Sequence, residues 1–236
     1  MKKLVFSLLM VPVLAWASGA ELHLDKAPDR SGDMAALQNG AKVFVQYCLG
    51  CHSASYMRYN RLQEIGLTEE QIRNEYLYTA DKVGELMRVA MRPAEAKQWF
   101  GAAPPDLTVI ARARASEFGS GPDWLYTYLR SFYRDDARPT GWNNIVFENV
   151  GMPHVLWELQ GEQVMGADHA LQLAKPGKMT AEQYDAMVGD LVGFLKFMGE
   201  PVADFRKKLG VGVLIVLAVL FGLSYALKRE YWKDVH

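Results

Sequence analysis

The residue types able to do chemistry are concentrated in one short stretch, Cys48-Leu49-Gly50-Cys51-His52. Cys48 and Cys51 are the only cysteines among 236 residues, and a histidine follows the second one directly. Two thiols separated by two residues lie about one helical turn apart, so each can add to a vinyl group of the same porphyrin. His52 is then placed to bind the iron as an axial ligand. The pattern predicts one covalently bound haem c.

Three other uses of this stretch need weighing. A redox Cys-x-x-Cys pair would need free thiols in a βαβ context, whereas the flanking sequence indicates helix. A structural zinc needs four Cys or His ligands, and His154 and His169 do not have the spacing of a zinc site. A disulfide across two residues beside a histidine also fits poorly. Haem is favoured because it uses the whole cysteine content at one site.

The composition indicates a packed protein of one or two domains. Hydrophobic residues make up 50% of the chain and charged residues 22%, which is not typical of disorder. The formal net charge of −1 argues against a nucleic-acid binder, which would show a basic excess. No cysteine remains outside the haem motif for a disulfide framework.

The N-terminus has the pattern of a secretory signal peptide. Residues 1–3 are Met-Lys-Lys, residues 4–16 are almost wholly apolar, and residues 17–20 are small. A basic, an apolar and a small-residue region in this order predict export and cleavage near Ala20. The alternative is an apolar helix that stays attached.

The C-terminus carries a second apolar segment. Leu209–Leu227 contains no charged residue and is nearly long enough to cross a hydrocarbon core at ~1.5 Å per residue. Basic residues flank it on both sides, and aromatic residues stand where an interfacial belt would lie: Tyr225, Tyr231 and Trp232. A central helix of a soluble core is the alternative, but the apolar residues run all round the segment, which favours a membrane span.

Together the two ends predict four segments. These are a signal peptide at 1–20, a periplasmic domain at 21–205, a transmembrane anchor at 206–228 and a cytoplasmic tail at 229–236. The signal peptide fixes the orientation, because the basic residues on the two sides of the anchor are nearly equal in number.

Periodicity and capping patterns predict a mainly α fold. Helices are expected at 34–47, 68–79, 81–91, 122–133 and 180–199, with a shorter one ending at Arg114. Capping boxes, Thr68 with Gln71 and Thr180 with Gln183, mark two of the helix starts. Loops are expected at 101–108, 134–144, 149–153 and 161–177.

Two features leave alternatives open. Gly40 lies inside a predicted helix, where it either permits another element to approach closely or is merely tolerated at the surface. Glu69, Glu70 and Glu75 form either a solvated helix side or part of an acidic docking surface, and a solvated side is the commoner case.

A haem that transfers electrons usually has a second axial ligand, and methionine raises the potential. Met152 is favoured because it lies in a Gly-Met-Pro turn far from the haem motif, where the chain can return across the other haem face. The rivals are His23, His154, His169, His236, Met57, Met87, Met91, Met187 and Met198. Two of these methionines belong to the predicted core face of the last soluble helix and one is too near His52, whereas Met87 and Met91 stay open.

The motif order resembles the bacterial cytochrome c1 family of the cytochrome bc1 complex. A signal peptide is followed by Cys-x-x-Cys-His-Ser, Pro-Pro-Asp-Leu-Thr, Arg-Ala-Arg, Gly-Met-Pro and a C-terminal anchor. The resemblance covers nearly the whole mature chain. Its most specific parts are Cys48–Ser53, Gly101–Arg114, Met152-Pro153 and Arg206–Trp232.

The resemblance implies a role for each matching residue. Cys48 and Cys51 would form the thioethers, with His52 as the proximal and Met152 as the distal iron ligand. The loop with Pro104, Pro105 and Leu107 would pack at the haem, and Arg114 would pair with a propionate rather than form a surface salt bridge. Trp124 stands where the family often has a tyrosine that touches a propionate, and an indole does not donate as a phenol does.

The resemblance also implies a cytochrome c-like haem domain on one transmembrane helix, with the helix before Cys48 crossing the helix from Thr180 at Gly40. The implied function is electron transfer in the bacterial plasma membrane, within a ubiquinol–cytochrome c reductase. A Rieske iron–sulfur protein would reduce the haem, which would reduce a soluble or tethered cytochrome c. Cytochrome b and membrane lipid would surround the anchor in a dimeric complex that translocates protons, with no catalysis by this chain alone.

Three other functions remain to be distinguished. A free-standing membrane-tethered cytochrome that donates electrons to a terminal oxidase would purify without cytochrome b. A haem enzyme or gas sensor would need an open sixth position at the iron. A purely structural membrane subunit would hold no haem after denaturation.

Overall fold

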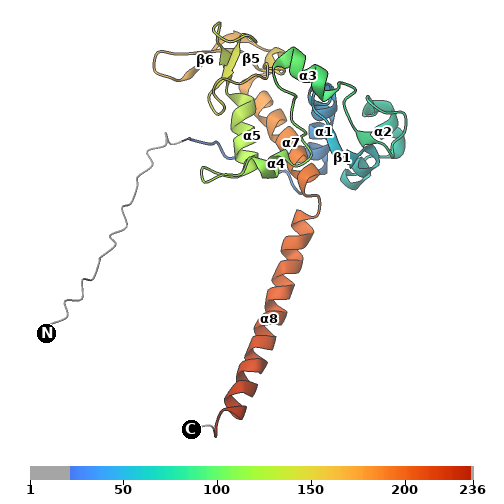
Figure 1. Cartoon of the computed structure of the whole chain (residues 1–236), viewed down its shortest axis with the longest axis vertical. Coiled ribbons are helices and arrows are strands. Elements are labelled where there is room, and N and C mark those ends of the chain that lie inside the picture. The colour runs from blue at the N-terminus through green and yellow to red at the C-terminus, as the bar shows by residue number, and fades with distance from the viewer. Residues whose placement is uncertain (1–21, 235–236) are drawn as a thin grey trace, which may run out of the picture.

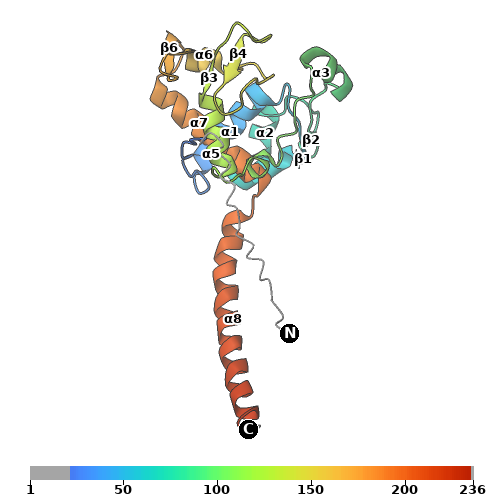
Figure 2. The ribbon, with the colours of Figure 1, turned by 60° about the vertical axis from the view of Figure 1, so that its left-hand side comes forward.

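Two crossing helices, α1 (Met34–Val43) and α7 (Ala181–Gly199), form the centre of the head of the protein (Figures 1 and 2). The computed structural model describes residues 22–234. At the crossing, a Cβ on Gly40 would lie 2.6 Å from the carbonyl carbon of Asp190 and 2.9 Å from Cβ of Phe194. The glycine therefore permits a close approach of the two helices, and tolerance at the surface is wrong because Gly40 is buried.

Helix α1 continues directly into the haem motif. Asp33 caps its start by accepting a hydrogen bond from the Ala36 amide. Its end widens into a π-helical turn, η1 (Phe44–Cys48), so the predicted helix over 34–47 is confirmed with a wider last turn. The ring of Phe44 lies 5.7 Å from that of Phe194, and this contact fixes η1 against α7.

Both predicted capping boxes are present. Each threonine accepts from the amide of the glutamine three residues later, whose side chain accepts from the threonine amide. They start α2 (Glu69–Glu75) and α7, although α2 ends earlier than expected.

The carboxylates on α2 are partly neutralised within the head. Glu69 lies 2.9 Å from Arg73, and Glu75 lies 3.0 Å from Lys42 on α1. These pairs favour a solvated helix side over an acidic docking surface, because two of the charges already have partners.

The helix predicted at 81–91 is wrong. The segment forms turns and a short strand, β2 (Leu86–Met87), which pairs antiparallel with β1 (Ala54–Arg58). The carbonyls of Val83 and Glu85 accept hydrogen bonds from residues that follow β1, so their backbone groups are satisfied outside a helix. Pro93 follows this segment at the first position of the next helix, α3 (Pro93–Phe100).

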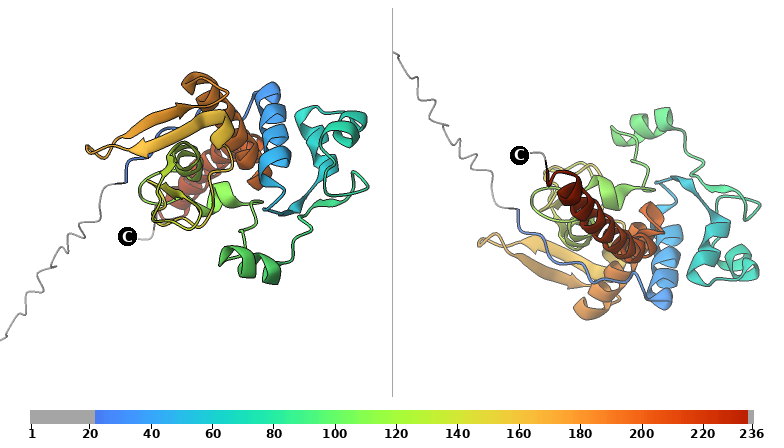
Figure 3. Two further views of the ribbon diagram at one scale, coloured as in Figure 1. Left: turned by 90° about the horizontal axis from the view of Figure 1, so that it is seen from above. Right: turned by 90° about the horizontal axis from the view of Figure 1, so that it is seen from below.

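The loop predicted at 161–177 is also wrong. It folds as an antiparallel hairpin of β5 (Gly161–Met165) and β6 (Leu171–Pro176), which lies on the opposite side of the head from α2 (Figure 3). Gln163 on β5 donates to the carbonyls of Arg130 and Phe132. The hairpin is thus held by hydrogen bonds to residues more than 30 positions away. The alternation of apolar and polar residues that marks a strand in a sequence does not predict such contacts.

The remaining elements are short and connect these parts. They are the 3-10 helix η2 (Tyr59–Ile65), α4 (Ile110–Ala113), α5 (Gly121–Arg130), β3 (Phe132–Arg134), β4 (Trp142–Asn144) and α6 (Trp157–Gln160). The predicted helix over 122–133 ends early because its last residues form β3, which pairs with β4. That pairing also replaces the end of the loop predicted at 134–144.

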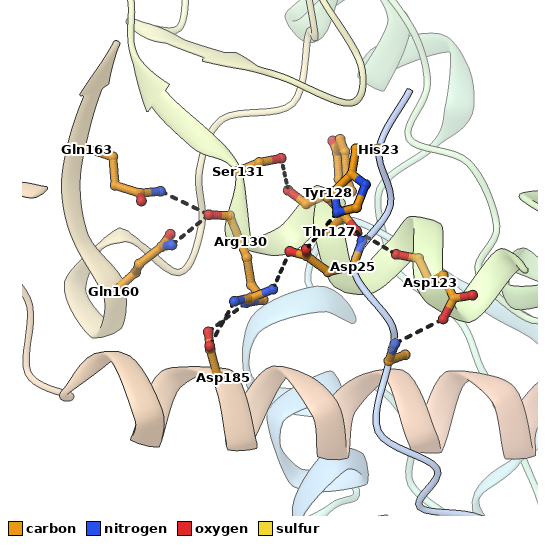
Figure 4. A network of polar contacts seen from close by, with 11 residues as sticks. His23, Asp25, Asp123, Thr127, Tyr128, Arg130, Ser131, Gln160, Gln163 and Asp185 are labelled. Atoms are coloured by element: carbon orange, nitrogen blue, oxygen red, sulfur yellow. Dashed lines mark hydrogen bonds and ion pairs between the residues drawn. The ribbon is translucent and has the colours of Figure 1, made fainter. Parts of the chain in front are cut away.

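An extended N-terminal segment is tied across α5 by polar contacts (Figure 4). Asp123 accepts from the amide of Ala27 at 2.9 Å and from Lys26 at 2.8 Å. Arg130 binds Asp185 on α7 through two hydrogen bonds of 2.6 and 2.8 Å and reaches Asp25 at 2.7 Å. The Arg130–Asp185 pair joins α5 to α7, and both helices contribute walls to the cavity described below.

The C-terminal helix α8 (Ala203–Tyr231) projects alone from the head (Figures 1 and 2). Within the described residues it is the one helix long and apolar enough to cross a membrane, and the most apolar 18-residue window of Phe205–Tyr231 has a mean hydropathy of 2.4. None of its most apolar window is buried against the head. A mainly helical fold with one such C-terminal helix is therefore confirmed, whereas the predicted signal peptide at 1–20 lies outside the described residues.

Candidate haem site

A cavity of about 340 Å³ opens beside the Cys48–His52 stretch, in the size range of small-molecule sites. Its walls come from η1, the loop at 101–105, α4, α5, α7 and the segment at 147–155. All nine residues singled out from the sequence line it: Cys48, Cys51, His52, Pro104, Pro105, Leu107, Arg114, Trp124 and Met152. The fold thus gathers into one cavity residues spread over more than 100 positions.

His52 has a fixed orientation. Its Nδ1 lies 2.7 Å from the carbonyl oxygen of Pro105, a distance at which the ring N–H donates and Nε2 keeps its lone pair. Burial lowers the pKa of His52, although the Pro105 carbonyl and the Asp106 carboxylate act in the opposite direction. A neutral imidazole with one nitrogen tied to a backbone carbonyl is the usual form of a metal-binding histidine.

The proline loop is pinned beside this histidine by its own polar residues. The amide of Leu107 donates to the carbonyl of Ser53 at 2.9 Å. Asp106 accepts from the amides of Ser55 and Thr108, both at 2.8 Å. Because Pro104 and Pro105 have no N–H, the loop lines the apolar cavity without leaving those two donors unpaired.

The two cysteines are free thiols in the structure and are not joined by a disulfide. Burial, with a smaller contribution from Cys51, raises the pKa of Cys48 to about 12. A redox Cys-x-x-Cys needs a lowered thiol pKa, so this surrounding disfavours that use. The same thiols are free to form covalent bonds to a group held in the cavity.

Met152 reaches the cavity from a loop held by buried asparagines. Asn143 accepts from the amide of Asn149 at 2.8 Å, and the Asn144 carboxamide oxygen accepts from the amides of Val146 and Phe147. Asn149 has a φ of 60°, a left-handed conformation that asparagine tolerates. These contacts set the path of the loop that delivers Met152.

The rival methionines lie elsewhere. Four of them are at most 4% exposed and belong to the core: Met57, Met87, Met187 and Met198. Met91 is partly exposed and does not line the cavity. Among the methionines of residues 22–234, Met152 is therefore the one that lines the cavity with His52.

The histidines considered for a structural zinc site, His154 and His169, do not form a set of ligands with the cysteines. His154 is buried and stacked on Phe132 at 4.8 Å, and burial lowers its pKa to about 4. His169 lies between β5 and β6, on the hairpin. Across residues 22–234, no three His, Cys, Asp or Glu side chains gather in a way that could hold a metal ion.

An aromatic column on α5 forms one wall of the cavity. Trp124 stacks on Tyr128 with ring centroids 4.8 Å apart and planes 14° apart. The guanidinium of Arg114 lies 4.5 Å above the Trp124 ring. The Tyr128 hydroxyl donates to Sδ of Met152 at 3.4 Å, and burial raises the pKa of Tyr128, so the phenol stays protonated.

Sequence reasoning missed Tyr128 and the leucine walls. Two leucine pairs line the cavity from neighbouring helices: Leu125 and Leu129 on α5, and Leu191 and Leu195 on α7. The i, i+4 spacing of Trp124 with Tyr128, and of Leu191 with Leu195, was available as a signal. It marks a shared helix face but does not distinguish a cavity wall from an ordinary core.

The donor set fits a c-type haem. Two thiols and a neutral imidazole come from one stretch, a thioether comes from a distant loop, and most of the remaining wall is apolar. Thiols can carry the covalent links, while imidazole and thioether are both established haem iron ligands. Arg114 is the one cationic side chain that the described part of the chain contributes to the cavity wall.

Comparison with known proteins agrees with this chemistry. The sequence model of the Cytochrome C1 family matches residues 25–235. The chain is 46% identical to cytochrome c1 of Allochromatium vinosum over 250 residues, covering all of both chains, and 29% identical to that of Rhodospirillum rubrum, covering 86% of this chain and 83% of the relative. It is also 51% identical, over 100% of its length and 98% of the relative, to a Nitrosomonas europaea protein named ammonia monooxygenase gamma subunit.

Proposed function

Because the chain belongs to the cytochrome c1 family, we propose that it carries the haem c that transfers electrons within a ubiquinol–cytochrome c reductase. The observation that carries this proposal is the meeting of Cys48, Cys51, His52 and Met152 in one apolar cavity. Such a set can hold a haem covalently and bind its iron from both faces.

Each of these side chains then has a defined task. Cys48 and Cys51 would form the thioethers, while Nε2 of His52 and Sδ of Met152 would bind the iron. The Pro105 carbonyl holds the imidazole in orientation at 2.7 Å. When bound, the haem supplies a one-electron Fe(III)/Fe(II) couple.

The walls tune that couple and keep water out. Leucines of α5 and α7 and the prolines of the 101–105 loop line the cavity, and a low dielectric disfavours the more highly charged oxidised state. Arg114 pairs with a propionate in this proposal, as the family resemblance implies. Trp124 supports that guanidinium from below by its ring face, at 4.5 Å, in place of a phenol contact.

The arrangement in the membrane follows from the two ends of the chain. We place a cleaved signal peptide at 1–20, the haem domain at 21–205 in the periplasm, the anchor at 206–228 and a cytoplasmic tail at 229–236. The exposed apolar surface of α8 needs lipid or a membrane partner to cover it. Cytochrome b is the partner we propose along the anchor.

The redox partners complete the proposal. A Rieske iron–sulfur protein donates the electron, and a soluble or tethered cytochrome c accepts it, within a dimeric complex. Quinol oxidation and proton translocation belong to the complex, and this chain alone catalyses no reaction.

Purification of the full chain from its native membrane in a mild detergent tests this function. We expect a c-type haem to purify together with b-type haem, a Rieske signal and antimycin-sensitive quinol oxidation. A c-type haem that purifies alone and donates directly to a terminal oxidase would instead favour the free-standing cytochrome.

The ligand assignment has its own test, the substitution Met152→Leu. We expect loss of the long-wavelength sulfur-to-iron charge-transfer band and a fall in midpoint potential of roughly 0.1 V or more, within the ~0.8 V range that axial ligands span. A matched control is Met187→Leu, which replaces a buried core methionine outside the cavity and should leave band and potential unchanged.

The name of the Nitrosomonas relative raises a second candidate, a subunit of an oxygen-using enzyme, and identity of 51% over the whole chain gives it weight. A haem that reacts with oxygen needs an open coordination position, whereas Met152 shares the cavity with His52. Exposure of the reduced protein to carbon monoxide distinguishes the two. An unchanged spectrum supports electron transfer, and a ligand-bound spectrum supports the oxygen-using role.

A further inference from the structure

We propose that Tyr128 is a positioning residue for Met152, and that its hydrogen bond to the thioether raises the reduction potential of the haem. This inference rests on the proposed function, in which Sδ of Met152 binds the iron. It concerns a residue on α5, remote in sequence from both the haem motif and the methionine loop.

The contact itself is specific. The Tyr128 hydroxyl lies 3.4 Å from Sδ of Met152, within the range of a hydrogen bond to sulfur. Tyr128 is only 9% exposed, and among the described residues the sulfur is the hydrogen-bond partner of this hydroxyl. A buried phenol needs a hydrogen-bond acceptor, and it donates to a weak acceptor such as a thioether when no stronger acceptor lies within reach.

The ring cannot easily turn away from the sulfur. Trp124 stacks on one side of it at 4.8 Å, and Phe132 meets it edge-on at 5.0 Å and 67°. The backbone carbonyl of Tyr128 accepts from the side chain of buried Asn144 at 2.8 Å. Asn144 also accepts hydrogen bonds from the loop that leads to Met152, so the same asparagine helps to position both the phenol and the sulfur.

The chemistry follows from the two lone pairs of a thioether sulfur. One lone pair can bind the iron while the other accepts the hydrogen bond from the phenol. The hydrogen bond draws electron density from the sulfur, which weakens it as a donor and disfavours the oxidised iron relative to the reduced iron. It also restricts an otherwise flexible methionine side chain to one orientation.

The test is Tyr128→Phe in the full haem-loaded chain in detergent. Phenylalanine keeps the ring between its aromatic neighbours and removes only the hydroxyl. We expect the long-wavelength charge-transfer band to remain and the midpoint potential to fall. A three- to tenfold shift of the oxidised-to-reduced ratio corresponds to ~28 to 59 mV for one electron.

A matched control is Tyr184→Phe. This tyrosine is also buried, and its hydroxyl donates to the backbone carbonyl of Leu129 at 2.8 Å without touching Met152. Its loss should lower the melting temperature and leave the potential unchanged. A potential for Tyr128→Phe that equals that of wild type, or an equal fall in both variants, overturns the inference.

Failure of this inference is distinguishable from failure of the proposed function. If Met152→Leu keeps the charge-transfer band, Met152 is not the ligand and the proposed function loses its basis. If Met152→Leu loses the band while Tyr128→Phe has the wild-type potential, only the role of Tyr128 is wrong.

A measurement on the unaltered protein covers the case in which the phenylalanine variant does not take up haem. In the reduced state we expect a slowly exchanging hydroxyl proton with a nuclear Overhauser contact to the ε-methyl of Met152. If the Tyr128 hydroxyl proton instead exchanges at the rate of solvent-exposed phenols, the hydrogen bond is absent and the inference fails.

Discussion

The substitution Gly40→Ala tests the helix crossing on which the cavity depends. A methyl group at this position would lie 2.6 Å from the carbonyl carbon of Asp190, whereas ordinary contact begins at 3.4 Å. Helices α1 and α7 would have to separate by about 0.8 Å, and more to clear the carbonyl oxygen. The obstacle is helix backbone, which cannot rotate aside as a side chain can.

The size of the effect follows from two opposing terms. Overpacking a core costs about 1–3 kcal/mol, and an immovable neighbour places this site near the upper value. Replacing glycine by alanine within a helix returns about 0.5–1 kcal/mol. The net loss of about 2 kcal/mol corresponds to a fall in melting temperature of roughly 4–8 °C for a chain of this size.

The assay is thermal unfolding of the haem-loaded chain in detergent, followed by helix circular dichroism and by haem absorbance. Because α1 continues through η1 into the stretch with both cysteines, and α7 carries Leu191 and Leu195, the haem signal should be lost together with helicity. Gly32→Ala is the control, since a Cβ there would meet nothing within 4 Å. A Gly40→Ala protein as stable as this control would refute the reasoning about the crossing.

Two further predictions concern the N-terminal segment and the haem attachment. Burial would raise the pKa of Asp123, but hydrogen bonds from Lys26 and Ala27 outweigh it and the pKa is lowered. Its stabilisation is therefore present above the ordinary value of 3.8 and is lost as pH falls through the lower folded pKa. Asp123→Asn should lose about 1 kcal/mol at neutral pH and show no difference from wild type in strong acid, and a pH-independent difference would contradict this. Cys51→Ala should leave the haem attached through Cys48 alone, so the denatured protein keeps its haem with an absorption band shifted to longer wavelength by the free vinyl group. Release of the haem on denaturation would contradict attachment at Cys48.

Much of the site could be predicted because its most specific residues are local in sequence. The two thiols and His52 lie within one short stretch, and the capping boxes close their hydrogen bonds across three residues. The apolar composition of α8 likewise identifies it without any tertiary contact. Such features depend on neighbours along the chain, so spacing is sufficient to find them.

The strands could not be predicted in the same way. The hairpin of β5 and β6 has an exposed Val164 and Leu173, so it lacks a clean alternation of buried and exposed residues. The segment at 81–91 has a helical composition, yet its carbonyls pair with residues after β1. In both places backbone hydrogen bonds to distant residues decided the structure over local preference.

By itself, then, the sequence was sufficient to predict a covalently attached haem, an axial histidine and an apolar C-terminal helix, because each prediction depends on adjacent residues. The sequence and the family resemblance favoured Met152 as the second ligand, but only the tertiary structure showed that it lines the cavity with His52 while the rival methionines do not. Only the tertiary structure placed the Tyr128 hydroxyl beside its sulfur. The reason is physical. Whether a methionine or tyrosine side chain reaches the cavity depends on how α5 packs against α7 and on the two buried asparagines that hold the loop before Met152. Those contacts join residues far apart in the chain, so the spacing of residues along the sequence does not predict them.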